Sequence, residues 1–177
     1  MSRALLVGRF QPLHRGHLHA MADALRRYDE VLVGVGSAQY GHTRDNPFTC
    51  GERFEFLHAA FEHFGWKNVH AFPITDIHHY AGWVRHVESI VPPFDVVLSN
   101  NPLTLRLFSA ARYPVRPVAL WKPGDCQGKI VRRRWAQGDA ASDLLLPSVA
   151  RVVERIQGRQ RVARLMREGA LGRASPR

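Results

Sequence analysis

The sequence predicts one α/β domain with a doubly wound, Rossmann-like parallel sheet of five strands and helices on both faces. Two observations support this fold class. Short apolar runs alternate along the chain with segments of helical periodicity, and such alternation is typical of strand–helix–strand units with parallel strands. The chain has 177 residues, 45% of them hydrophobic, which suffices for one substantial core. We expect the domain to cover residues 1–168 and a basic, disordered tail to cover residues 169–177.

The first half of the chain contains three predicted strands and two predicted helices. Residues 4–7 are continuously apolar, as expected for a parallel strand that is covered on both faces. Apolar residues at helical spacing predict a helix over residues 16–27. Thr49 and Glu52 form a capping box that opens the second helix, and its expected core face consists of Phe54, Leu57, His58 and Phe61. The other two strands are expected at residues 30–35 and 69–73.

The second half of the chain repeats this alternation. A helix over residues 81–91 is stopped by Pro92 and Pro93, and Pro102 opens the following helix in its first turn. Gly158 is expected just past the end of the last helix, a position that glycine commonly occupies. The remaining elements are strands at residues 95–99 and 115–120 and helices at residues 102–110, 131–137 and 147–157.

The segment after the first strand carries the strongest functional signal. Gly8 ends the strand, and His14 and His17 stand three residues apart in the first turn of the next helix, on one side of it. The free amides and the dipole of a helix start bind phosphate, and Gly16 lets a ligand approach the backbone. Imidazoles at this place can hydrogen-bond phosphate oxygens or carry a proton to a leaving pyrophosphate. Arg9 adds further donors, so the segment predicts a phosphate site.

A pair of histidines three residues apart is, by itself, more often a polar helix face than a site. The context favours a site, because Gly8 and Gly36 follow two adjacent predicted strands. Open α/β sheets bind their ligands at this edge, beyond the carboxyl ends of the strands. The sequence contains neither a Walker fingerprint nor a dinucleotide-binding fingerprint.

The pattern His14-x-Gly16-His17, preceded by a strand and by Gly8-Arg9-Phe10, resembles the signature of the nucleotidyltransferase superfamily of adenylyl and cytidylyl transferases. The resemblance spans about residues 3–158. Further segments occur in the order seen in archaeal-type nicotinamide-nucleotide adenylyltransferases, at residues 36–39, 44–49, 51–53, 76–77, 83–84, 92–95, 101–102 and 132–134.

This resemblance implies transfer of AMP from ATP to nicotinamide mononucleotide (NMN), which forms NAD and pyrophosphate. It implies Mg²⁺ bound mainly through ATP phosphates, no metal site built by the protein, and a homo-oligomer such as a hexamer. The implied catalytic residues are Arg9, His14, His17, Arg44 and Arg132. The implied ATP-binding residues are Gly8, Arg9, Phe10, His14, Gly16, His17, Arg44, Lys129, Val131 and Arg132. The implied NMN-binding residues are Ser37, Asp76, Tyr80, Trp83 and Asn101.

The connection over residues 36–48 is long for a compact α/β domain, and long loops are more often functional than structural. It carries the polar residues Ser37, Gln39, His42 and Arg44, which could close over a triphosphate. The resemblance implies that Arg44 contacts ATP phosphates. The alternative is a solvated loop in which Arg44 pairs with Asp45.

The resemblance implies that the segment Asp76 to Trp83 forms the nicotinamide pocket. Trp83 can stack on an aromatic ring, and an adjacent carboxylate suits a cationic pyridinium. The alternative is that Trp83 belongs to the core, because Ala81, Val84, Val87 and Ile90 form an apolar helix face close to it. Two residues depart from the family pattern: Tyr80 stands in the place of an asparagine and Gly82 in the place of a bulkier residue. The adjacent His78 and His79 point apart, so we expect no metal there.

Two later motifs also depart from the family pattern. Asn100 replaces the glycine before Asn101, and asparagine tolerates the positive φ that such a turn needs. Gln127 and Lys129 replace a serine and a threonine before Arg132. Lys129 can still neutralise phosphate. Arg132 is the expected phosphate clamp, whereas Arg133 and Arg134 are equally well explained as surface charges.

Composition narrows the function classes. The net charge is +10, but residues 159–177 hold six arginines and one glutamate, and no RNA- or DNA-binding motif accompanies them, so no specific nucleic acid is expected. The sequence has no long apolar stretch and no signal-peptide pattern, which predicts a cytoplasmic protein that does not bind membranes. Cys50 and Cys126 lack CxxC spacing, so neither a disulfide framework nor a zinc site is expected, and Cys50 is expected to be inert.

Two alternative functions remain open. One is adenylyl or cytidylyl transfer to another phosphorylated acceptor, such as nicotinate mononucleotide, phosphopantetheine or FMN. The other is a non-catalytic module that binds nucleotide or RNA through the basic tail. Trp83 beside Asp76 favours a pyridinium acceptor, and the complete set of His14, Gly16 and His17 favours an enzyme.

Overall fold

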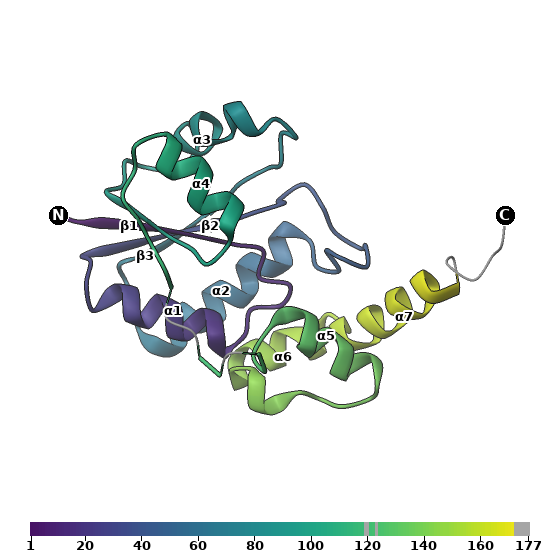
Figure 1. The fold of residues 1–177 in the computed structure, drawn as a ribbon. Helices are drawn as coiled ribbons and strands as arrows, with labels where there is room; N and C mark the ends of the chain where they lie inside the picture. Colours follow the sequence, from purple (N-terminus) through teal and green to yellow (C-terminus); the bar gives the residue numbers. More distant parts are fainter. Residues whose placement is uncertain (119–120, 123, 172–177) are drawn as a thin grey trace, which may run out of the picture.

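A computed structural model describes residues 1–118, 121–122 and 124–171, and in them the chain forms one parallel, five-stranded sheet with helices on both faces (Figure 1). The strand order is β3-β2-β1-β4-β5. This confirms the predicted fold class. The strands are β1 (Arg3–Gly8), β2 (Glu30–Val35), β3 (Val69–Pro73), β4 (Val96–Leu98) and β5 (Val115–Arg116).

The centre of the sheet is β1, which pairs with both β2 and β4. The chain adds β2 and β3 on one side of β1 and then crosses to add β4 and β5 on the other. The connections therefore diverge between β1 and β4, and open α/β sheets bind ligands at such a switch point. The edge strand β5 is shorter than predicted, and residues 119–120 of that prediction lie outside the described residues.

The helices cover the sheet in two layers, with α1 and α2 on one face and α3 and α4 on the other (Figure 1). Alternate residues of β1 serve both cores, because Leu6 packs towards the first layer and Leu5 towards the second. None of the helices in the described ranges combines the length and apolar character that crossing a bilayer requires. The helices are α1 (Arg15–Leu25), α2 (Cys50–Phe64), α3 (Tyr80–Glu88), α4 (Pro102–Ala110), α5 (Gly128–Ala136), α6 (Pro147–Arg155) and α7 (Gly158–Leu171), with a 3₁₀ turn at Ser142–Leu144.

Helix α2 begins with the predicted capping box, in which Thr49 Oγ1 accepts from the Glu52 amide at 3.3 Å and the Glu52 carboxylate accepts from the Thr49 amide at 2.9 Å. The predicted core face of α2 is wrong in part. His58 is exposed, and Phe54 and Phe61 are only partly buried. Apolar residues surround most of this helix, so periodicity alone does not select the buried stripe. The buried residues are Arg53, Phe56, Leu57 and Ala60.

The C-terminal part differs most from the prediction. Gly158 does not end the last helix but begins α7, and Gln157 before it takes the left-handed conformation, with φ of 54°. A Cβ at Gly158 would come within 2.8 Å of Phe48 Cε1, so the glycine serves close packing. Helix α7 packs against α5 and extends to Leu171, past the expected domain boundary at residue 168. Residues 172–177 of the expected tail lie outside the described residues.

Candidate active site

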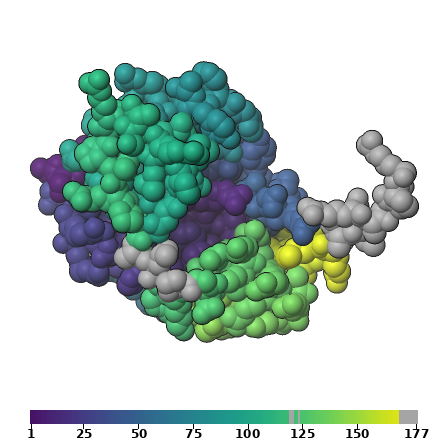
Figure 2. All heavy atoms as spheres, in the orientation of Figure 1, coloured from purple at the N-terminus to yellow at the C-terminus, as the bar shows by residue number. Residues whose placement is uncertain are grey.

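A cavity of about 300 Å³ opens at the carboxyl ends of β1 and β4, at the switch point of the sheet. Figure 2 shows purple N-terminal atoms at the centre of this side of the molecule, between the teal-green surface around α4 and the green surface of α5. We call this cavity the phosphate pocket. Its lining includes Gly8, His14, Gly16, His17, Ser99, Asn101, Cys126 and Gly128.

The two predicted histidines lie together in the phosphate pocket. His14 is the N-cap residue of α1, and its ring stacks on the ring of His17 with 3.7 Å between centroids and 27° between planes. The backbone N–H of His14 donates to His17 Nδ1 at 3.3 Å. A Cβ at Gly16 would stand 3.1 Å from the ring of His14, so Gly16 leaves room for this ring. Phe10 is buried and packs 4.7 Å from the His17 ring.

Burial keeps both imidazoles neutral. It lowers the pKa of His14 to about 4. Burial, and then the neighbouring His14, lower the pKa of His17 well below its usual range. Because His17 Nδ1 accepts a hydrogen bond, the ring proton of neutral His17 must sit on Nε2. At neutral pH the pair therefore offers hydrogen-bond donors rather than cations, which suits binding of phosphate oxygens better than shuttling a proton.

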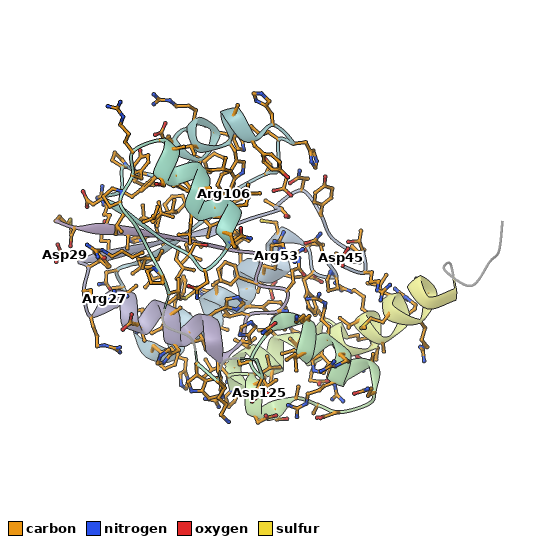
Figure 3. The ribbon with its side chains drawn as sticks, viewed as in Figure 1. Arg27, Asp29, Asp45, Arg53, Arg106 and Asp125 are labelled. Atoms are coloured by element: carbon orange, nitrogen blue, oxygen red, sulfur yellow. The ribbon has the colours of Figure 1, made fainter. Side chains whose placement is uncertain are left out.

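Sequence reasoning missed Arg53, the residue that connects the loops of this edge. Its side chain is fully buried on α2 and points towards the loops that follow β1 and β2 (Figure 3). Burial lowers its pKa. Its position on the apolar stripe of α2, three residues before Phe56, was the available signal. It donates to five backbone carbonyl oxygens, those of Arg9, Gly36, Ser37, Tyr40 and Thr49, at 2.7–3.5 Å.

The long loop over residues 36–48 is held at both ends. Arg53 binds its first residues, and the side chain of Gln11 bonds the amide and the carbonyl of Phe48, both at 2.9 Å. Arg44 is exposed at the middle of the loop. The alternative pairing of Arg44 with Asp45 is not found among the described residues, so the Arg44 side chain is available to a ligand.

Helix α5 brings Arg132 to the same edge. Its guanidinium donates to the Gln11 carbonyl at 2.6 Å, and burial, followed by the nearby Arg9, lowers its pKa. Arg9 itself is exposed. A Cβ at Gly128 would stand 3.1 Å from the Gln11 carbonyl, so glycine allows the start of α5 to approach. Arg9 thus lies close to both Arg53 and Arg132. The three guanidinium groups gather at this edge of the sheet, and none of them lines the phosphate pocket itself.

The other predicted α5 residues fit less well. The side chain of Val131 is fully buried in the core, and its amide donates to the Gln127 carbonyl, so the predicted contact of Val131 with ATP stays a prediction that neither group supports. Lys129 is exposed and does not line the pocket. Arg134 forms ion pairs with Asp139 and Asp143 at the surface, which agrees with its expected explanation as a surface charge.

A second cavity of about 350 Å³ adjoins the first, and we call it the mononucleotide pocket. Ser37 Oγ donates to Asp76 Oδ2 at 2.7 Å, which fixes the carboxylate. Trp83 is half-buried: it packs edge-on against Phe108, with 5.6 Å between centroids, and also lines the cavity. Trp83 therefore contacts the core and also faces the cavity, and its stacking on a ligand ring stays a prediction. The lining residues are Asp76, Ile77, His78, His79, Tyr80, Trp83, Asn101, Leu103, Thr104 and Leu107.

Asn101 lines both pockets. It is the N-cap of α4, and its side-chain oxygen accepts from the amides of Leu103 at 2.9 Å and Thr104 at 3.2 Å. The side-chain NH₂ group has no partner in the described part of the chain. Asn100 does not take the expected positive φ. Its side chain instead bonds both backbone groups of Val118, at 2.9 and 3.1 Å, and so links the ends of β4 and β5.

Comparison with known proteins finds similar sequences and similar folds. The family model described as cytidylyltransferase-like matches residues 5–134. A nicotinamide-nucleotide adenylyltransferase of Picrophilus torridus is 41% identical over 90% of this chain and 95% of that protein. One of Pyrococcus furiosus is also 41% identical, over 93% of this chain and 89% of that protein.

Among solved structures, a bifunctional NMN adenylyltransferase/ADP ribose pyrophosphatase of Francisella tularensis, complexed with AMP and a manganese ion, has a TM-score of 0.76. It is 18% identical to this chain, and the match covers 96% of this chain and 53% of that one. The chain thus spans about half of that bifunctional protein, and at this identity the likeness concerns the fold.

Proposed function

We propose that this chain transfers AMP from ATP to NMN. The chain belongs to the cytidylyltransferase-like family and to the nicotinamide-nucleotide adenylyltransferases within it. The products are NAD and pyrophosphate, so the reaction belongs to NAD biosynthesis. The observation that carries the proposal is the pair of adjoining pockets that share Asn101. One pocket has neutral imidazoles at a helix start, and the other has a carboxylate beside an indole.

In this reaction a phosphate oxygen of NMN attacks the α-phosphorus of ATP in line. The bond from the α-phosphorus to its bridging oxygen breaks, and pyrophosphate leaves with that electron pair. No side chain needs to act as nucleophile, because phosphoryl transfer depends on positioning and charge neutralisation. A shared residue between the pockets suits such direct transfer, since the two substrates must meet there.

The roles of the side chains follow from their surroundings. His14 and His17 donate hydrogen bonds to phosphate oxygens, and the amides at the start of α1 add to them. Arg9, Arg44 and Arg132 neutralise the triphosphate. In the second pocket, Trp83 stacks on the pyridine ring, while Asp76, held by Ser37, faces the cationic ring. Tyr80, 64% exposed at the start of α3, lines the same pocket and contacts the bound NMN.

The donor set of the phosphate pocket fits a divalent cation that enters with the nucleotide. Its lining contains no carboxylate, and the described residues hold no cluster of three metal-ligating side chains. We propose that Mg²⁺ is held mainly by phosphate oxygens and water, as this ion prefers. When bound, it neutralises charge on the phosphates.

We also propose that the protein is cytoplasmic and forms a homo-oligomer. Light scattering of the purified protein tests the oligomeric state.

The test is to incubate the purified protein with ATP, Mg²⁺ and single acceptors while pyrophosphate release is measured. The acceptors are NMN, nicotinate mononucleotide, phosphopantetheine and FMN. We expect release with NMN, and NAD as the product by mass spectrometry. Release with phosphopantetheine or FMN alone would assign a different transferase, and release with none of the four would overturn the enzyme assignment.

A further inference from the structure

Cys126 lies against the catalytic histidine pair. Its Sγ is 3.5 Å from His14 Nδ1 and accepts a hydrogen bond from the Gly16 amide at 3.3 Å. Both side chains are buried, with 7% of Cys126 and 6% of His14 exposed. The contact joins the loop before α5 to the first turn of α1, across 112 positions of sequence.

The direction of these hydrogen bonds follows from the chemistry of the groups. The Gly16 amide can only donate, so the sulfur accepts from it. Burial raises the pKa of Cys126, which keeps the thiol protonated. Within the described residues, the acceptor found for the S–H group is His14 Nδ1. This nitrogen lies at the N-terminal end of α1, where the positive end of the helix dipole favours an acceptor over a donor.

We propose that Cys126 is a positioning residue that holds neutral His14 in the tautomer with its proton on Nε2, so that the ring donates Nε2–H to a phosphate oxygen. The second part of this proposal rests on the proposed function. A neutral imidazole has one N–H group, so an S–H donor at Nδ1 fixes the proton on Nε2. The His14 amide does the same for His17 by donating to its Nδ1 at 3.3 Å. The two stacked rings therefore present the same tautomer.

The direct test is the tautomer of His14, read from the ¹⁵N chemical shifts of its ring nitrogens at pH 7 in the full chain. Wild-type protein is compared with Cys126→Ala, which removes the donor, and Cys126→Ser, which keeps one. We expect the proton on Nε2 in the wild type and in Cys126→Ser, and a mixture of tautomers in Cys126→Ala. A proton on Nδ1 in the wild type overturns the proposal, and so does an unchanged tautomer in Cys126→Ala.

Kinetics add a second readout. Loss of one hydrogen bond of this kind is expected to lower kcat about tenfold in Cys126→Ala, with Cys126→Ser recovering to within about threefold of wild type. Cys50→Ala is the matched control, because Cys50 is the other free thiol and lies in the first turn of α2. It should retain wild-type kcat. An equal loss in the alanine and serine variants of Cys126 indicates packing alone and overturns the proposal.

The two readouts separate this proposal from the proposed reaction. The tautomer is measured without any mononucleotide, so it can be read even if the wild type releases no pyrophosphate with NMN. In that case the reaction fails while the state of His14 is still decided. Conversely, normal NAD formation together with a proton on Nδ1 of His14 overturns only the role of Cys126.

Discussion

The phosphate pocket and the mononucleotide pocket adjoin each other, yet the protein holds their side chains very differently. In the first, His14 is buried against Cys126, and Arg53 bonds the surrounding carbonyls. In the second, His79 and Tyr80 are exposed. Contacts within the fold thus hold the side chains of the phosphate pocket, whereas several side chains of the mononucleotide pocket are exposed to solvent. Substitutions in the first should affect stability or chemistry, and those in the second should affect the affinity for one substrate.

The largest effect is expected from Arg53→Met. The substitution leaves five carbonyl oxygens without their donor, and breaking a buried network of this size should cost at least about 3 kcal/mol of unfolding free energy. Urea unfolding measures this. Arg155→Met is the control, because Arg155 makes an exposed ion pair with Glu55 that should contribute less than about 1 kcal/mol. Equal stability of the two variants would show that the hydrogen bonds of Arg53 contribute no more than an exposed ion pair.

His17→Ala should reduce turnover and leave the fold intact. Loss of one oriented donor at a phosphate typically raises the barrier by about 2.7–4 kcal/mol, or roughly 10²–10³ in kcat. His19→Ala is the matched control, since His19 is a half-buried histidine of the same helix that does not line the pocket. Steady-state kinetics with circular dichroism checks both variants. Near-normal turnover of His17→Ala removes the histidine pair from the mechanism.

The burial of His14 predicts a loss of stability in mild acid. Its pKa is about 4 in the folded protein against 6.5 for a free side chain, so between these values the unfolded chain takes up a proton that the folded one refuses. The free energy of unfolding should therefore fall as the pH drops from 6.5 towards 4, by up to about 3 kcal/mol. Urea unfolding across this range measures the slope. His14→Asn should make it shallower and leave the contribution of His17, whose pKa burial also lowers. An unchanged slope in that variant would show that His14 does not contribute.

Trp83→Ala should affect one substrate only. Loss of stacking on the pyridine ring should weaken NMN binding by about 1–3 kcal/mol, with ATP binding nearly unchanged. Trp66→Ala is the control, because Trp66 is half-buried, stacks on Phe64, and lines neither pocket. Calorimetric titrations and melting temperatures decide between the roles. A lower melting temperature with equal losses of both affinities would assign Trp83 to the core beside Phe108.

Local sequence patterns predicted the parts of the molecule that depend on neighbouring residues. The apolar runs located β2 and β3 at their observed bounds, and Pro102 marked the start of α4. The glycines and histidines after β1, which predicted a phosphate site, line the phosphate pocket. These features succeed because strand burial, proline geometry and helix starts are decided within a few residues.

The features that sequence reasoning missed depend on distant contacts. Arg53 received no role from the sequence, since its five acceptors lie in the two connections that follow β1 and β2. Cys126 contacts His14 across 112 positions of the sequence. Gly158 was read as a helix end because its neighbour across the fold, Phe48, is invisible in the local sequence. Each of these residues is defined by a partner far away in the chain.

The stereochemistry at the α-phosphorus tests direct transfer between the two pockets most closely. The wild-type protein is supplied with NMN and a single diastereomer of ATP that carries sulfur on the α-phosphorus, and the configuration of the dinucleotide product is determined. A single in-line displacement predicts inversion. Retention would require two displacements, and therefore a covalent intermediate on the protein, which would contradict transfer by positioning alone.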